Sequence, residues 1–110
     1  MTNLAKNTET NNTIKTIDIQ AKEWFDKVNG NSYFAALITL NFGMSNEKTI
    51  KVPFQYGYGD SSRYKSIEQL QKDGILPNEG TLQRDYFTDN NIIVRYSKQE
   101  KCKKSELKNI

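Results

Sequence analysis

Alternation of apolar and polar residues predicts β-strands in the first half of the chain. The clearest strand covers residues 32–42, in which every second side chain is apolar. Another strand runs from Thr49 to Tyr56 or Tyr58. Because proline lacks an amide hydrogen, Pro53 within this strand predicts either a sheet edge or a β-bulge.

The chain before residue 32 leaves two interpretations open. Residues 14–19 are rich in β-branched side chains and predict a first strand. Ala21–Val28 has apolar residues at a helical spacing. The same segment fits a strand that turns at Asn29-Gly30, a pair typical of β-hairpins. We favour the hairpin because the residues that follow are also predicted to be β.

One main helix is predicted after residues 60–62, Asp-Ser-Ser, which are all favoured at helix N-caps. Gly74 is a natural residue to end this helix. Residues 92–96 predict a last strand, and residues 81–88 fit no element clearly. The apolar stripe of the helix comprises Tyr64, Ile67 and Leu70.

Together these elements predict an α+β fold, with a small antiparallel β-sheet of about four strands and one main helix packed on one face. We expect a disordered segment at residues 1–13, a single domain at 14–97 and a Lys-rich tail at 98–110. Residues 1–12 and 99–110 should be dispensable for folding, because they hold few apolar side chains to offset the entropy of ordering. The predicted core comprises Phe34, Ile38, Leu40, Ile50, Val52, Phe54, Ile67 and Leu70.

Charge, cysteine content and hydropathy indicate the cellular compartment of the protein. The 110 residues carry a formal net charge of +3, and the excess of lysine lies in the C-terminal segment. A single cysteine, Cys102, cannot form an internal disulfide, which favours a reducing compartment. No apolar stretch is long enough for a membrane helix or a signal peptide, so we expect a cytoplasmic protein without membrane association.

The residues available for catalysis are few. The chain has no histidine, which removes Ser-His and Cys-His mechanisms and most zinc sites. No metal-binding or phosphate-binding motif is present. We therefore expect no enzymatic activity, no metal and no cofactor.

A tyrosine–glycine segment is the strongest candidate for a binding surface. Exposed tyrosines serve as anchors in protein interfaces and as stacking platforms for bases, whereas glycines can equally well form the bend between a strand and a helix. Two basic residues at the start of the helix add positive charge beside the tyrosines. The lone Trp24 is expected in the core. The candidate binding residues are Tyr56, Gly57, Tyr58, Gly59, Arg63 and Lys65.

Two motifs resemble those of small uncharacterised proteins from phage and mobile-element genomes: Lys22–Phe34 (KEWFDKVNGNSYF) and Pro53–Asp60 (PFQYGYGD). The resemblance covers roughly residues 17–75 and implies a setting rather than an activity, so no residue inherits a role from it. In such a setting, small non-enzymatic proteins bind host defence proteins or nucleic acid.

We therefore expect a small non-catalytic binding protein that acts by contact with a host or phage protein. A phage-type inhibitor of a host defence system, similar to an anti-CRISPR protein, is the most specific version. The alternative is a nucleic-acid-binding module that uses the tyrosine–glycine segment and the basic tail. The sequence leaves the oligomeric state open.

Overall fold

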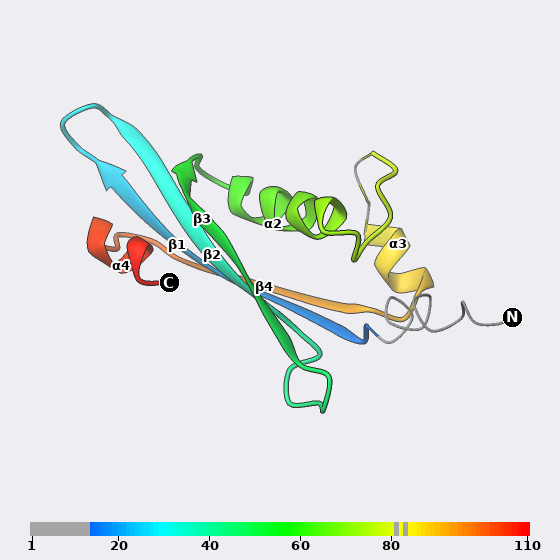
Figure 1. The fold of residues 1–110 in the computed structure, drawn as a ribbon. Coiled ribbons are helices and arrows are strands. Elements are labelled where there is room, and N and C mark those ends of the chain that lie inside the picture. Colours follow the sequence, from blue (N-terminus) through cyan, green and yellow to red (C-terminus); the bar gives the residue numbers. More distant parts are fainter. Residues whose placement is uncertain (1–13, 81, 83) are drawn as a thin grey trace, which may run out of the picture.

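The computed structural model describes residues 14–80, 82 and 84–110. Within this part of the chain the protein has an α+β fold with a four-stranded sheet, as predicted (Figure 1). The predicted disordered segment at residues 1–13 lies outside the described residues. The elements in order are β1 (Thr16–Asp26), β2 (Asn31–Leu40), β3 (Lys48–Tyr56), α2 (Ser61–Lys72), α3 (Arg84–Asp89), β4 (Ile93–Gln99) and α4 (Lys104–Lys108).

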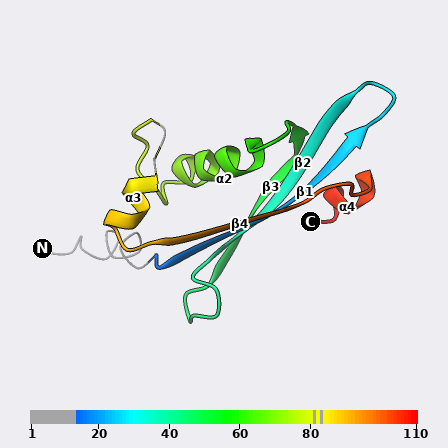
Figure 2. The same ribbon diagram turned by 180° about the vertical axis from the view of Figure 1, so that it is seen from behind.

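The strand order across the sheet is β3-β2-β1-β4. Strands β1, β2 and β3 form an antiparallel meander, but β4 pairs with β1 in parallel. The expectation of an antiparallel sheet is therefore wrong at one edge. After β3 the chain runs back along the sheet through α2 and α3 and starts β4 at the opposite end (Figures 1 and 2). Strand β4 therefore runs in the same direction as β1, whereas a hairpin connection would have made neighbouring strands antiparallel.

The first hairpin resolves the ambiguity before residue 32. Ala21 belongs to β1, which continues as one strand to Asp26, so the hairpin interpretation is confirmed. The carboxylate of Asp26 accepts hydrogen bonds from the Val28 amide at 3.0 Å and the Asn29 side chain at 2.8 Å. The Asn29 bond, assisted by the backbone bonds, holds the pKa of Asp26 below its usual range. Gly30 completes the turn with φ of 72°.

The main core lies between α2 and one face of the sheet. Most of the predicted core residues are found there, and Ile50 packs against them while partly buried. Tyr64 does not join them, because it is 55% exposed on the outer side of α2. Ser62 and Ser66 occupy the buried positions instead, and the Ser62 hydroxyl hydrogen-bonds the Tyr96 hydroxyl of β4 at 2.5 Å. The predicted residues that are buried in this core are Phe34, Ile38, Leu40, Val52, Ile67 and Leu70.

Phe54 was expected in this core but lies on the opposite face of the sheet. Val52 pairs with Ala36, yet Gln55 pairs with Phe34, so β3 gains one residue on β2 in between. This irregularity includes Pro53, where a bulge or an edge was predicted. Because side chains alternate between faces, one extra residue moves every following side chain to the other face. The core prediction for Phe54 failed because it ignored this consequence of the bulge.

The C-terminal segment packs on this second face, which α2 leaves free (Figures 1 and 2). Leu107 of α4 is 1% exposed and Cys102 is 6% exposed, and both cluster with Ala35 of β2. Lys98 belongs to β4. The structure thus places residues 98–110 in the end of β4 and in α4, packed on the sheet, and not in a separate tail. That the last part is dispensable for folding stays a prediction, and the burial of Leu107 argues against it. The high lysine content hid the signal of a short amphipathic helix, α4, whose few apolar side chains pack against the sheet.

Replacing Leu107 with alanine tests the structural role of α4. The change removes a fully buried side chain, so it should lower the free energy of unfolding by about 2–4 kcal/mol. Val28→Ala is the control: Val28 is 91% exposed, and its truncation should change stability by less than about 0.5 kcal/mol. Urea denaturation followed by circular dichroism measures both. Equal stabilities for the two variants would mean that α4 does not belong to the folded unit.

Candidate functional site

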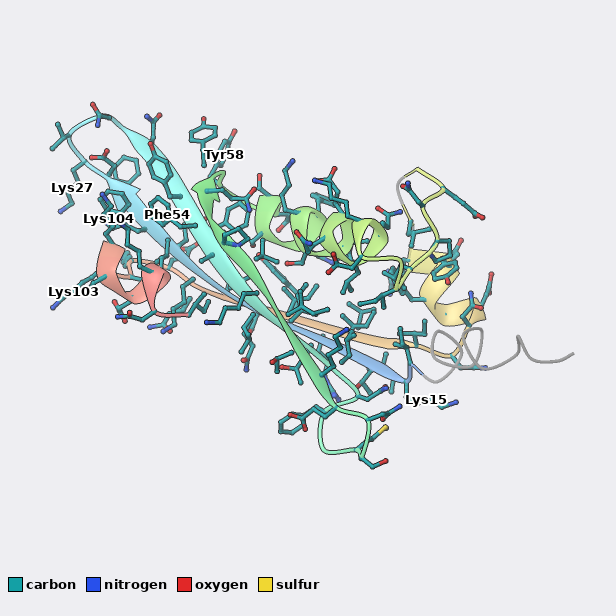
Figure 3. The ribbon with its side chains drawn as sticks, viewed as in Figure 1. Lys15, Lys27, Phe54, Tyr58, Lys103 and Lys104 are labelled. Carbon is teal, nitrogen blue, oxygen red and sulfur yellow. The ribbon has the colours of Figure 1, made fainter. Side chains whose placement is uncertain are left out.

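The two tyrosines of the predicted surface lie where β3 ends and the chain turns toward α2. Tyr56 is the last residue of β3 and is 61% exposed, and Tyr58 is 68% exposed. Figure 3 shows Tyr58 at this end of the molecule, beyond the tip of β3. The prediction that at least one tyrosine is exposed is confirmed, and its role in binding stays a prediction.

Gly57 and Gly59 shape the bend rather than the surface. A Cβ atom on Gly57 would lie 2.7 Å from Cε2 of the Phe34 ring and 3.0 Å from Cβ of Ser61, so the chain can pass this point only without a side chain. Gly59 has φ of 63°, and its carbonyl oxygen accepts a hydrogen bond from Lys98 Nζ at 3.0 Å. Of the two interpretations of these glycines, the geometry favours the strand-to-helix bend.

Exposed apolar side chains gather at the same end of the sheet. Phe25 pairs with Ser32 in the hairpin, and the Ser32 carbonyl accepts the Gly57 amide, so the end of β1 and the segment after β3 flank one residue of β2. Four of the eight large apolar residues that are exposed in the described chain lie at this end. We call this the hairpin-end surface: Phe25 (50% exposed), Val28 (91%), Tyr56 and Tyr58.

A row of aromatic rings supports Tyr56 from the face that carries α4. Tyr33 and Phe54 stack with centroids 5.2 Å apart and an angle of 7°, and Trp24 stacks on Tyr33 at 5.6 Å. Tyr56 meets Tyr33 edge-on at 5.9 Å. We call Trp24, Tyr33, Phe54 and Tyr56 the aromatic row. It crosses three strands, which fixes its rings relative to one another.

Sequence reasoning missed the aromatic row. Trp24 was expected in the core, but it is only partly buried and belongs to the smaller cluster beside α4. Half of the row was visible in principle, because a hairpin that turns at Asn29-Gly30 puts Trp24 and Tyr33 on the same face. A two-residue turn there would place Ala35 opposite Trp24, and only the observed turn over residues 27–30 pairs Trp24 with Tyr33. Phe54 could be added only by placing the β3 bulge.

Two lysines of α4 lie against the aromatic row. The ammonium group of Lys104 is 5.4 Å from the Trp24 ring centroid and 6.0 Å from that of Phe54, and Lys108 is 5.8 Å from Phe54. Figure 3 shows Phe54 and Lys104 close together between α4 and the sheet. These are cation–π distances, so the lysines both hold α4 in place and give the row a positive border.

Arg63 and Lys65 lie on a different surface from the aromatic row. Both line a groove of about 510 Å³ along α2, on the other side of the sheet. Lys65 pairs with Glu68 at 3.3 Å, and the Arg63 guanidinium is 5.9 Å from the Tyr64 ring. The structure therefore does not combine these two basic residues with Tyr56 into a single site.

A partly buried ion pair connects β1 to β4 near the hairpin end of the sheet. Lys98 Nζ is 3.0 Å from a Glu23 carboxylate oxygen, and their side chains are 14% and 15% exposed. Lys98 also contacts Glu100 at 3.3 Å. Burial disfavours the Lys98 charge, but the hydrogen bond and charge of Glu23, with help from Glu100, outweigh it and raise the Lys98 pKa. A raised lysine pKa stabilises the fold below the unfolded pKa, and this contribution is lost as the pH rises through the folded value.

The described residues offer little for metal or membrane chemistry. Among them, no cluster of three or more His, Cys, Asp and Glu side chains could hold a metal ion. Cys102 is buried, and its thiol donates to the Gln99 carbonyl at 3.3 Å. No helix in this part of the chain is both long and apolar enough to cross a membrane.

Comparison with known proteins gave no match. No family model fits the chain, and neither a curated protein nor a solved structure is similar to it.

Replacing Lys98 with methionine tests the ion pair that supports this end of the molecule. The change leaves the Glu23 carboxylate partly buried without its cation, so we expect a loss of about 1–3 kcal/mol in the free energy of unfolding. Lys65→Met is the matched control, since its pair with Glu68 is half exposed and should contribute at most about 0.5 kcal/mol.

A second substitution separates the ion pair from packing of the lysine stem. Adding Glu23→Gln to Lys98→Met removes the uncompensated charge and should recover part of the lost stability. Chemical denaturation of the four proteins gives the comparison. A double variant as unstable as Lys98→Met alone would assign the loss to packing instead.

Proposed function

We propose that this protein is a non-catalytic binding protein that acts by contact with another protein through the hairpin-end surface. The observation that carries the proposal is the gathering of Phe25, Val28, Tyr56 and Tyr58, each at least half exposed, at one end of the sheet. Large exposed apolar side chains that gather at one end of a small protein are typical of interaction sites, and here they lie on both faces of the sheet, with Phe25 on the face that carries α2 and Tyr56 on the face that carries α4.

The support beneath the two tyrosines favours this use. Tyr56 rests edge-on against Tyr33, which is itself stacked on both sides by Trp24 and Phe54. A ring held in this way loses little side-chain entropy on binding. Rigid, partly supported tyrosines are typical anchors of protein interfaces.

The charges near the surface suggest the chemistry of the partner. Lys27 lies in the tip of the hairpin, and Lys103 and Lys104 lie at the start of α4, as its N-cap and its first residue, near the same end of the sheet (Figure 3). A partner with an apolar groove and an acidic border would fit both features. Inhibition of a host defence protein is the most specific version of this proposal, and its support is the sequence resemblance to phage and mobile-element proteins.

Nucleic-acid binding is the second candidate, favoured by one observation: lysines lie beside aromatic rings on a sheet face, as in platforms for single strands. However, a base needs a free ring face for stacking. Tyr33 is stacked by two rings, and Phe54 is flanked by Tyr33 and two lysines. Among the four rings of the aromatic row only Tyr56 is well exposed, so the geometry favours a protein partner.

The double substitution Tyr56→Ala with Tyr58→Ala tests the surface. It should weaken partner binding by more than about 2 kcal/mol while the protein stays folded, because both side chains are mostly exposed. Tyr64→Ala is the matched control, since Tyr64 is 55% exposed but lies on α2, along the separate groove. The partner is first captured from a host lysate with the wild type and both variants as bait, and affinities are then measured by calorimetry.

Salt dependence separates the two candidates. Contact through apolar side chains should change little between low and physiological salt, whereas binding to phosphates falls steeply. An unchanged affinity of the double variant would reject the hairpin-end surface, and steep salt dependence with bound nucleic acid would favour the second candidate.

A further inference from the structure

The outer edge of β4 is a free pairing edge. Strand order places β4 at the end of the sheet, and no other described segment pairs with it. The Ile93 amide donates to the carbonyl of Lys15, the residue just before β1, and the parallel register with β1 continues from there. Because the bonding direction alternates along a strand, Val94, Tyr96 and Lys98 direct their amides and carbonyls away from the sheet.

The two edges of the sheet differ in their protection against pairing. On the opposite edge, β3 carries a register shift, a proline at Pro53 and exposed lysines at Lys48 and Lys51, all devices that prevent strand addition. Strand β4 has neither proline nor bulge.

The charges of β4 are also already engaged within the chain. Arg95 forms a two-pronged ion pair with Asp18, at 2.6 and 3.1 Å, and Lys98 contacts Glu23 and Glu100. An inward-pointing lysine usually discourages strand addition, but here its charge is neutralised by the two carboxylates. The edge of β4 therefore presents backbone groups without a repelling charge.

The sequence of β4 suits pairing with itself. In an antiparallel pair centred on Tyr96, Val94 would face Lys98 of the second copy, Arg95 would face Ser97, and Ile93 would face Gln99. No like charges meet in this register. Val94, Tyr96 and Lys98, whose amides point outward, fall at the hydrogen-bonded positions of this antiparallel pair. Each chain would therefore donate one backbone hydrogen bond and accept one at each of these three residues.

The ends of the strand suit the same register. Asn91 and Lys101 have positive φ, 58° and 61°, and turn the chain away from the strand direction. They lie equally far from Tyr96 along the chain, so a two-fold axis through Tyr96 would place each turn of one copy beside the opposite turn of the other. Ile93, which is 56% exposed, would gain cover from the second copy.

We propose that two copies of this chain associate through their β4 edges, antiparallel and centred on Tyr96, to form a continuous eight-stranded sheet. The occupant of the edge is a second copy, and the proposal is independent of the function of the hairpin-end surface.

Substitutions at Ser97 test the register at a position that tolerates change. Ser97 is exposed on the α4 face and would lie opposite Arg95 of the second copy, twice in each dimer. Ser97→Lys should weaken the dimer roughly tenfold through like charges, and Ser97→Glu should strengthen it by a similar factor. Both changes should leave the thermal stability of the isolated chain nearly unchanged. Analytical ultracentrifugation over a wide concentration range measures the association constants.

Amide hydrogen exchange identifies the interface directly. The amides of Val94, Tyr96 and Lys98 should exchange rapidly in dilute protein and become protected together as concentration rises, whereas the Ile93 amide should be protected throughout. A chain that stays monomeric at all concentrations, or a dimer in which the three amides exchange freely, would overturn the proposal. Protection of these amides only in complex with another protein would assign the edge to that partner instead.

Discussion

One extra residue in β3 decides which aromatic side chains each face of the sheet receives. Without the register shift, Phe54 would lie opposite Phe34 and join the core beneath α2. With it, Phe54 stacks on Tyr33, and Tyr56 follows to the same face. The main core keeps Phe34, whose ring edge comes so close to Gly57 that no side chain fits there. The bulge thus adds Phe54 and Tyr56 to the aromatic row, and Gly57 lets the chain bend toward α2 past the Phe34 ring.

The second face of the sheet explains why the C-terminal segment folds. Ala35 and the aromatic row would otherwise leave an apolar surface in water, and α4 covers part of it with Leu107 and the Cys102 side chain. The lysines of α4 do not oppose this packing, because their ammonium groups rest against aromatic rings while their stems add apolar contact. Positive charge in this segment is therefore compatible with burial of the helix that carries it.

The sequence predicted the strands and the helix that are determined by the residues within them. Alternation identified β2 and β3, and the stripe ending at Gly74 identified α2, where the Ile75 amide indeed bonds the Leu70 carbonyl. The direction of β4 could not be predicted, because it depends on the path of α2 and α3 along the sheet. Pro53 indicated that a bulge or an edge was present, but not how many residues the shift would add. The helix α4 was missed because its apolar residues are too few to form a period, and only the aromatic row opposite them makes their burial favourable.

The candidate site shows the same limit. The exposure of Tyr56 and Tyr58 followed from their position at the end of a strand, whereas the separation of Arg63 and Lys65 from Tyr56 followed from the bulge, which moved Tyr56 to the opposite face. The prediction grouped Tyr56, Arg63 and Lys65 into one surface because they are close in sequence. Neighbouring residues of a strand point to opposite faces of the sheet, however, and a helix that starts nearby packs on one face only.

The hairpin-end surface and the β4 edge lie on different parts of the same sheet, and their geometry links the two proposals. The edge runs along the strand direction from Ile93 to Gln99. Gln99 pairs with Lys22, and the hairpin-end surface lies farther along β1 in the same direction. A two-fold axis through Tyr96 reverses the strand direction, so the two hairpin-end surfaces of a dimer would face opposite ways along the extended sheet. Neither would be covered by dimerisation. If both proposals hold, such a dimer would bind two separate partner molecules, and it would gain avidity only when those partners are themselves held together in one assembly.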